Sequence, residues 1–208
     1  MATIKQNINE GQDKAPRKTI FHQLLSPNAT EGYVVHNVED LTDEAFTILS
    51  AASDTTGHTM TTTTYYVLSN PDVYHTLTAE LKSAFPDPTA KLDYLTLEKL
   101  PYLTAVIKEG LRLSFGVPGR LPRMIEKDGA VFNGYAVPRG TIVGMSSWLM
   151  HRDSNFFSNP DTFDPTRWLD PANIGRLERQ LVAFGRGSRQ CIGMQYVFLY
   201  PPNGNVHN

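Results

Sequence analysis

The residues whose types and spacing could support chemistry stand near the C-terminus, in the segment FGRGSRQCIG at positions 184–193. Cys191 is the only cysteine in the 208-residue chain, so it cannot form an internal disulfide. Glycines and arginines surround it: Gly185, Gly187, Gly193, Arg186 and Arg189. Glycine permits turns that aim backbone N–H groups at an anion. Nearby guanidinium groups favour ionisation of a thiol, and the dipole of the helix that is expected to start after position 191 has the same effect. The pattern therefore predicts a thiolate at position 191.

A stabilised thiolate commonly acts as a nucleophile, a redox thiol or a metal ligand. A nucleophile needs a histidine base and a third group that positions it. A redox thiol usually has a resolving cysteine, and this sequence has none. A zinc site normally needs further Cys or His at ligand spacing, whereas the six histidines are scattered singly. A single axial thiolate on haem needs no second protein ligand.

The spacing of the segment resembles the haem-binding signature of the cytochrome P-450 family, with matches at Phe184, Gly187, Arg189, Cys191 and Gly193. The resemblance implies that these residues form a cofactor-binding loop and that Cys191 is the metal ligand, the axial thiolate of haem b (iron protoporphyrin IX). It also implies that Arg189, together with Arg123 from an earlier segment, binds haem propionates, a role that suits the forked guanidinium group.

A second stretch, AASDTTG at positions 51–57, places small and weak helix formers inside a long helical segment. Close helix packing through small residues would explain it. The stretch also resembles the oxygen-binding helix of the same family. By that resemblance, Asp54 and Thr55 are the catalytic acid and threonine linked to proton delivery. Ala51 faces the substrate pocket, to which the later residues Val117 and Pro118 also belong.

A third pattern is Glu109-x-x-Arg112, whose side chains are i, i+3 neighbours on a helix. Alone it predicts a surface ion pair, which contributes ~0–1 kcal/mol. It resembles the E-x-x-R helix of the family, and the segment at positions 160–168 resembles the family's P-x-x-F-x-P-x-R-W sequence. The resemblance implies that Arg167 joins Glu109 and Arg112 in a buried network that braces the cysteine loop.

The elements expected to position these residues are mainly helical. Periodicity and capping predict helices at 18–26, 42–69 with Thr42 as the N-cap, 72–85, 95–100 and 101–113. In the last of these, Leu103, Ile107 and Leu111 are spaced for burial. Short strands are expected over 117–148, the last of them in the stretch TIVGMSSWLM, with a hairpin at Asn133-Gly134.

Composition describes an ordinary globular protein, with 40% hydrophobic and 19% charged residues. The net charge of −2 and the pI near 6.3 give no indication of a nucleic-acid partner. No apolar run approaches the ~20 residues of a membrane span. The N-terminal segment lacks the apolar core of a signal peptide. A lone cysteine fits a reducing compartment. Residues 1–40 are polar and expected to be partly disordered, and residues 201–208 are expected to form a disordered tail.

Taken together, the motifs make residues 41–200 similar to part of a haem domain. The implied fold is mainly α with a small β portion, the C-terminal half of the cytochrome P-450 fold, truncated at both ends and closest in style to fungal members. The implied function is a haem-thiolate monooxygenase that inserts one oxygen atom of O2 into an organic substrate, with electrons from an NADPH-dependent cytochrome P-450 reductase. Such enzymes usually reside on the endoplasmic reticulum membrane, and any membrane contact would come from segments absent here, so localisation stays open. The alternative is a non-catalytic fragment that binds haem weakly or acts only through protein contacts.

Overall fold

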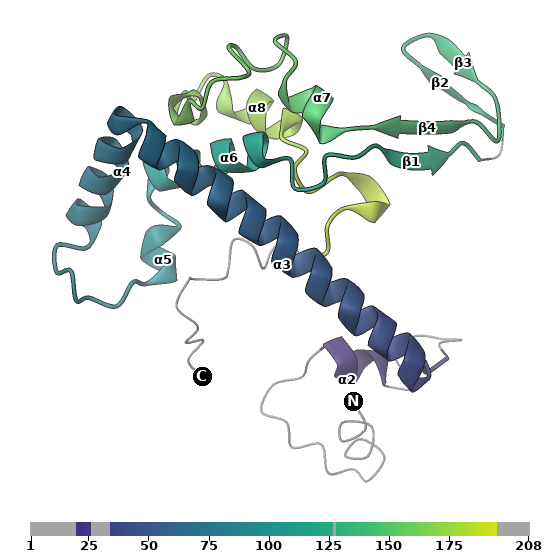
Figure 1. Cartoon of the computed structure of the whole chain (residues 1–208). Coiled ribbons are helices and arrows are strands. Elements are labelled where there is room, and N and C mark those ends of the chain that lie inside the picture. Colours follow the sequence, from purple (N-terminus) through teal and green to yellow (C-terminus); the bar gives the residue numbers. More distant parts are fainter. Residues whose placement is uncertain (1–19, 26–33, 127, 195–208) are drawn as a thin grey trace. The chain divides into compact units, whose positions relative to one another are not determined.

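The computed structural model describes residues 20–25, 34–126 and 128–194 (Figure 1). The helices are α2 (Ile20–Leu24), α3 (Val38–Ser69), α4 (Pro71–Ala84), α5 (Tyr94–Leu97), α6 (Pro101–Ser114), α7 (Ser147–His151) and α8 (Ile174–Gln180). Two 3-10 turns are η1 (Pro165–Trp168) and η2 (Gly187–Arg189). The strands are β1 (Leu121–Met124), β2 (Ala130–Phe132), β3 (Tyr135–Val137) and β4 (Ile142–Met145). The expectation of a mainly helical fold with a small β portion is confirmed.

The chain divides into two compact units, Met1–Asp54 and Thr55–Asn208. The division falls inside α3 rather than at residue 40, where the composition changes. The first unit contains α2 and the first half of α3, with Leu25 and Leu41 as its buried apolar side chains. The second unit contains all the other elements. The predicted tail at 201–208 and the predicted helix after Cys191, from position 195 onward, lie outside the described residues.

The long helix α3 begins at Val38, four residues before the predicted start. Thr42 is not its N-cap, because its hydroxyl donates to the Val38 carbonyl from within the first turn (2.8 Å). The cap is Asn37, whose Oδ1 accepts the backbone N–H of Asp40 (2.8 Å). The prediction missed it because Asn37 precedes a valine rather than an obvious apolar run.

Helix α6 is the centre of the second unit. One apolar cluster joins it to α4 and to the segment before η1 through Val73, Tyr102, Val106, Leu113 and Phe163. A second cluster includes Trp168 of η1 and contains Ala105, Phe157, Trp168 and Leu177. The first turn of α6 is fixed by Glu80, whose carboxylate accepts the N–H groups of Tyr102 and Leu103 (both 2.8 Å). The prediction that Ile107 is buried is wrong, since it is 36% exposed. Glu109 and Arg112 occupy the buried face instead.

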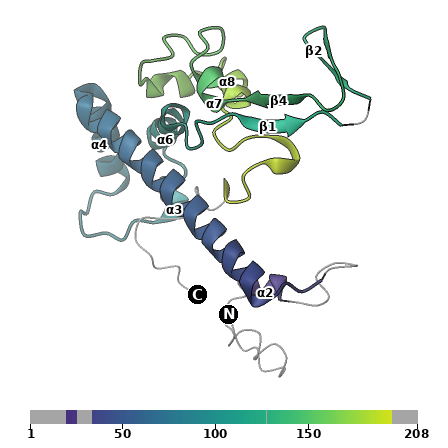
Figure 2. The ribbon, with the colours of Figure 1, turned by 45° about the vertical axis from the view of Figure 1, so that its right-hand side comes forward.

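The strands form two antiparallel pairs. In the first, β1 pairs with β4, with Leu121 opposite Met145 and Met124 opposite Ile142. The hairpin β2–β3 is inserted between these strands in sequence and lies at the end of the pair away from α7 (Figures 1 and 2). Its two-residue turn has positive φ at both Asn133 (48°) and Gly134 (85°). This is the geometry that Asn-Gly favours, so the predicted hairpin is confirmed.

The strand expected over 141–150 ends at Met145, and α7 takes the remaining residues. Ser146 ends the strand by capping the helix, because its Oγ accepts the N–H of Trp148 (3.2 Å). The same hydroxyl donates to the Pro118 carbonyl (2.7 Å). The segment at 117–118 is thereby tied to the start of α7.

Candidate functional site

The cysteine loop, residues 184–193, is held by its own backbone. The N–H of Cys191 donates to the Phe184 carbonyl (2.8 Å), which closes the loop on itself. Gly185 and Gly187 have φ of 68° and 79°, values that residues with a Cβ rarely adopt. Cys191 itself is exposed and is not part of either apolar cluster. The loop therefore presents a thiol to its surroundings rather than using it to fill a core.

The charged groups of the loop are both cationic, Arg186 and Arg189. Arg186 Nη2 donates to the carbonyls of Glu178 (3.1 Å) and Arg179 (2.6 Å), the last turn of α8. It therefore fastens the loop to the C-terminus of that helix, where a cation is favoured by the helix dipole. Arg189 is exposed, as an arginine that binds an external carboxylate would need to be.

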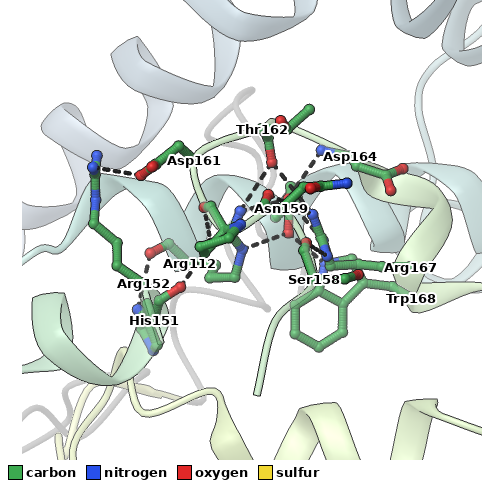
Figure 3. A network of polar contacts seen from close by, with 12 residues as sticks. Arg112, His151, Arg152, Ser158, Asn159, Asp161, Thr162, Asp164, Arg167 and Trp168 are labelled. Carbon is green, nitrogen blue, oxygen red and sulfur yellow. Dashed lines mark hydrogen bonds and ion pairs between the residues drawn. The ribbon is translucent and has the colours of Figure 1, made fainter. Parts of the chain in front are cut away.

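A buried polar network centres on the carboxylate of Glu109. Figure 3 labels its partners Arg112, Asp164, Arg167 and Trp168. Its two oxygens accept five hydrogen bonds, from Arg112 Nε (2.9 Å), Arg112 Nη2 (2.8 Å), Arg167 Nε (3.1 Å), Trp168 Nε1 (2.9 Å) and the Asp164 N–H (3.0 Å). Glu109 and Arg112 have no exposed surface, so this is not the surface pair that the spacing alone would suggest. Each charge is paired and hydrogen-bonded, which is the condition for burying it.

The remaining donors of the two arginines hold the irregular segment at 158–162. Arg112 Nη1 donates to the carbonyls of His151 (2.8 Å) and Pro160 (2.6 Å). Arg167 Nη1 donates to the Ser158 carbonyl (2.8 Å), and Nη2 of Arg112 reaches that of Thr162 (3.1 Å). The network thus fixes a stretch outside the helices and strands, which is also closed by the Thr162 N–H donating to the Asn159 carbonyl (3.0 Å) (Figure 3).

His151 is a further buried member that the sequence analysis did not single out. It has no exposed surface, and its Nδ1 lies 2.9 Å from the Arg112 carbonyl. Its Nε2 accepts the N–H of Val182, just before the cysteine loop (2.9 Å). The pKa of His151 is lowered to about 4, chiefly by burial, which outweighs the hydrogen bond to the Arg112 carbonyl that raises it; the Arg112 charge lowers it and the Glu109 charge raises it by less. The imidazole is therefore neutral at physiological pH.

The residues expected at the substrate side are found near one another only in part. Thr55 is half-buried, and a Cβ placed on Gly116 would lie 3.7 Å from the Thr55 Cβ, next to Val117 and Pro118 in sequence. Ser147 Oγ donates to the Val117 carbonyl (3.4 Å), so this segment is held from α7. Asp54 and Ala51 are exposed residues of the first unit, and their roles toward a proton or a substrate stay predictions.

Comparison with known proteins agrees with this geometry. The model of the family described as "Cytochrome P450" matches residues 1–196. The chain belongs to the cytochrome P450 family. It is 42% identical over 183 residues to the cytochrome P450 monooxygenase macH of Penicillium terrestre, covering 87% of this chain and 36% of that protein. It is 39% identical over 194 residues to the cytochrome P450 monooxygenase MO6277 of Ascocoryne sarcoides, covering 92% of this chain and 37% of that protein.

A third relative, the cytochrome P450 monooxygenase sol6 of Alternaria solani, is 39% identical over 186 residues. The match covers 89% of this chain and 40% of that protein. The predicted resemblance to the family and to its fungal members is therefore confirmed. The chain spans well under half the length of the curated relatives that it matches.

The residues present fit the haem that the cytochrome P450 family implies. Cys191 is exposed, its loop carries no acidic side chain, and a Cβ added at Gly185 or Gly187 would meet no atom within 4 Å. In the described part of the chain, no group of three or more His, Cys, Asp or Glu side chains could hold a metal ion. Arg123 is exposed on β1 and donates to the adjacent Pro122 carbonyl (2.8 Å), and its role toward a propionate stays a prediction.

Among the described residues, no helix has the length and apolar character to span a membrane. Sequence reasoning missed the roles of His151 and the Trp168 indole because their partners, Val182 and Glu109, lie 31 and 59 residues away in the chain. The only available signal for Trp168 was its place beside Arg167 in the P-x-x-F-x-P-x-R-W segment.

Proposed function

We propose that this chain provides the thiolate-ligand portion of a haem-thiolate monooxygenase, which inserts one oxygen atom of O2 into an organic substrate. The observation that carries the proposal is an exposed thiol, Cys191, on a glycine loop that follows Val182, a backbone partner of the buried Glu109–Arg112–Arg167 network through His151. The names of the fungal relatives support the same reaction class.

In this proposal, Cys191 binds the iron as a thiolate. Haem held in this way supplies the oxygen chemistry, because the thiolate donates electron density that favours cleavage of the O–O bond. The chain's contribution is to hold the sulfur in place through the Cys191–Phe184 backbone bond and the positive-φ glycines. Arg189 and Arg123 are the proposed partners of the propionates, and Phe184, Gly187 and Gly193 complete the loop.

On the substrate side, the Thr55 hydroxyl is proposed to relay a proton through its Oγ1, with Asp54 as the acid that resupplies it. Val117, Pro118 and Ala51 are proposed to contact the substrate. Support comes from the position of Thr55 against Gly116 and from the serine hydroxyls that fix the 117–118 carbonyls. Electrons are proposed to come from an NADPH-dependent reductase.

The alternative is a chain that acts only through protein contacts. It is favoured by the large apolar side chains exposed on β1 and β4, namely Leu121, Met124, Ile142 and Met145. Large apolar side chains are normally covered in a stable assembly. Their exposure on β1 and β4 is therefore also compatible with a haem protein in which other polypeptide covers these strands.

Haem titration of the purified chain distinguishes the two. We expect saturable uptake and, after reduction under carbon monoxide, a thiolate-type difference band that disappears in Cys191→Ala. The matched control is Ser188→Ala, an exposed loop position that should retain the band. Absence of haem uptake by the wild-type chain, or a band that survives in Cys191→Ala, would contradict the proposal. Turnover with a reductase would then test catalysis.

A further inference from the structure

His151 lies where α7, α6 and the segment before the cysteine loop meet, and the proposed chemistry gives it no role. Its ring centroid is 6.0 Å from that of Phe115, with 28° between the planes, and 6.1 Å from that of Phe157, with 86° between the planes. The side chain is completely buried. Packing on two sides therefore fixes both the position and the orientation of the imidazole.

The hydrogen bonds of the ring define its tautomer. The Val182 backbone N–H can only donate, so Nε2 of His151 must be the unprotonated nitrogen that accepts (2.9 Å). Nδ1 then carries the hydrogen and donates to the Arg112 carbonyl (2.9 Å). A charged imidazolium could not accept from Val182, so this arrangement requires the neutral ring that burial enforces.

His151 and Arg112 are bonded reciprocally. The Arg112 guanidinium donates to the His151 carbonyl (2.8 Å), while the His151 ring donates to the Arg112 carbonyl. Movement of either residue therefore affects the other. Since Arg112 is bound through two nitrogens to Glu109, the imidazole is attached to the rigid centre of the buried network.

The other end of the imidazole leads to the thiol. Val182 is held by Nε2 through its N–H, and its carbonyl accepts the N–H of Gly185 (2.9 Å). Between these residues, the Phe184 carbonyl accepts the N–H of Cys191 (2.8 Å). His151 is thus a side-chain link between the Arg112 backbone and the base of the loop.

We propose that His151 is a positioning residue that couples the Glu109–Arg112–Arg167 network to the cysteine loop through the Val182 amide. The consequence for haem rests on the function proposed above, whereas the coupling itself is a property of the chain without cofactor. The two can therefore be tested separately.

Two isosteric substitutions separate the two nitrogens. The amide nitrogen of asparagine overlies Nδ1 of histidine, so His151→Asn keeps the donor to Arg112 and loses the acceptor for Val182. The amide oxygen of glutamine overlies Nε2, so His151→Gln keeps the acceptor for Val182 and loses the donor. His75→Asn, at an exposed position on α4, is the matched control.

The first readout uses the haem-free chain. We expect amide hydrogen exchange at Val182 and across 184–191 to be faster in His151→Asn by about fivefold or more, the effect of orphaning one buried donor. His151→Gln should stay closer to wild type, and His75→Asn should match it. The second readout is the carbon monoxide difference spectrum, where His151→Asn should lose more of the thiolate-type band than His151→Gln.

Equal behaviour of the Asn and Gln variants in both readouts would overturn the proposal, because a residue that only fills space does not distinguish them. If both variants fail to fold, the tautomer of His151 in the wild-type chain still tests the proposal. Nitrogen-15 chemical shifts of labelled His151 should show the Nδ1–H tautomer, and the opposite tautomer refutes the inference. Failure of wild-type haem uptake counts against the proposed function alone, since the exchange experiment needs no haem.

Discussion

Replacing Glu109 by glutamine should destabilise the second unit strongly without changing its surface. The carboxylate accepts five hydrogen bonds, and its negative charge is the partner of Arg112 and Arg167. In Glu109→Gln, one oxygen becomes an NH2 group that faces donors, and two buried guanidinium groups lose their counter-charge.

The size of the effect follows from burial. Glu109 and Arg112 are 0% exposed and Arg167 is 9% exposed, so water cannot replace the lost partner. Removing one member of a buried ion pair costs about 3–5 kcal/mol. For a chain of this length, each kcal/mol lowers the melting temperature by about 2–4 °C, so a decrease of about 10 °C is expected.

Urea unfolding followed by circular dichroism measures this free energy, with Glu98→Gln as the control at an exposed position. In an Arg167→Met background, Glu109→Gln should cost less than in wild type by about 1 kcal/mol or more, because the two residues share a bond. A loss of less than about 1 kcal/mol for Glu109→Gln, or strict additivity with Arg167→Met, would show that the network is not the buried unit described above.

Three further outcomes are expected. Gly110→Ala should reduce the melting temperature because the new methyl group would overlap Thr63 Oγ1, and Thr63→Ala in the same chain should restore part of the loss. Acid should destabilise the chain through His151, whose pKa is about 4 in the folded state and near 6.5 in the unfolded state. The free energy of unfolding should therefore be at its full value above about pH 6.5 and fall by up to about 3 kcal/mol toward pH 4. Urea titrations at several pH values should show that His151→Gln removes this pH-dependent loss. Gly187→Ala should weaken haem uptake about tenfold, since φ of 79° costs a residue with a Cβ about 1–2 kcal/mol, whereas Gly119→Ala, which meets no atom within 4 Å, should not.

Local signals in the sequence were sufficient where a residue's own backbone determines the structure. Asn133-Gly134 predicted a two-residue hairpin because both residues tolerate positive φ, and the hairpin is present. Pro101 marked the start of α6 for a similar reason. The predicted start of α3 at Thr42 was wrong because the Asn37 Oδ1 accepts a free backbone N–H at the helix end, whereas the Thr42 hydroxyl donates to the Val38 carbonyl.

Tertiary contacts account for what the sequence did not reveal. On α6 the apolar stripe through Ile107 suggested one buried face, yet the face that packs inward carries Glu109 and Arg112. Helical periodicity assigns charged side chains to the exposed face of a helix. It contains no information on partners fifty or more residues later in the chain, such as Arg167 and Trp168. Only the resemblance to a family motif indicated that the pair would be internal.

The buried charges of Arg112 and Arg167 also explain how the irregular segment at 158–162 is held in place. The stretch at 158–162 offers mostly backbone carbonyls to Arg112 and Arg167, and carbonyls are present whatever the side chains are. A network that binds carbonyls therefore tolerates side-chain change in the segment while demanding that Glu109 and both arginines be kept. If His151 couples this network to the Val182 amide as proposed, the geometry of the loop around Cys191 is set before any cofactor binds, which is what preorganisation of a metal ligand requires.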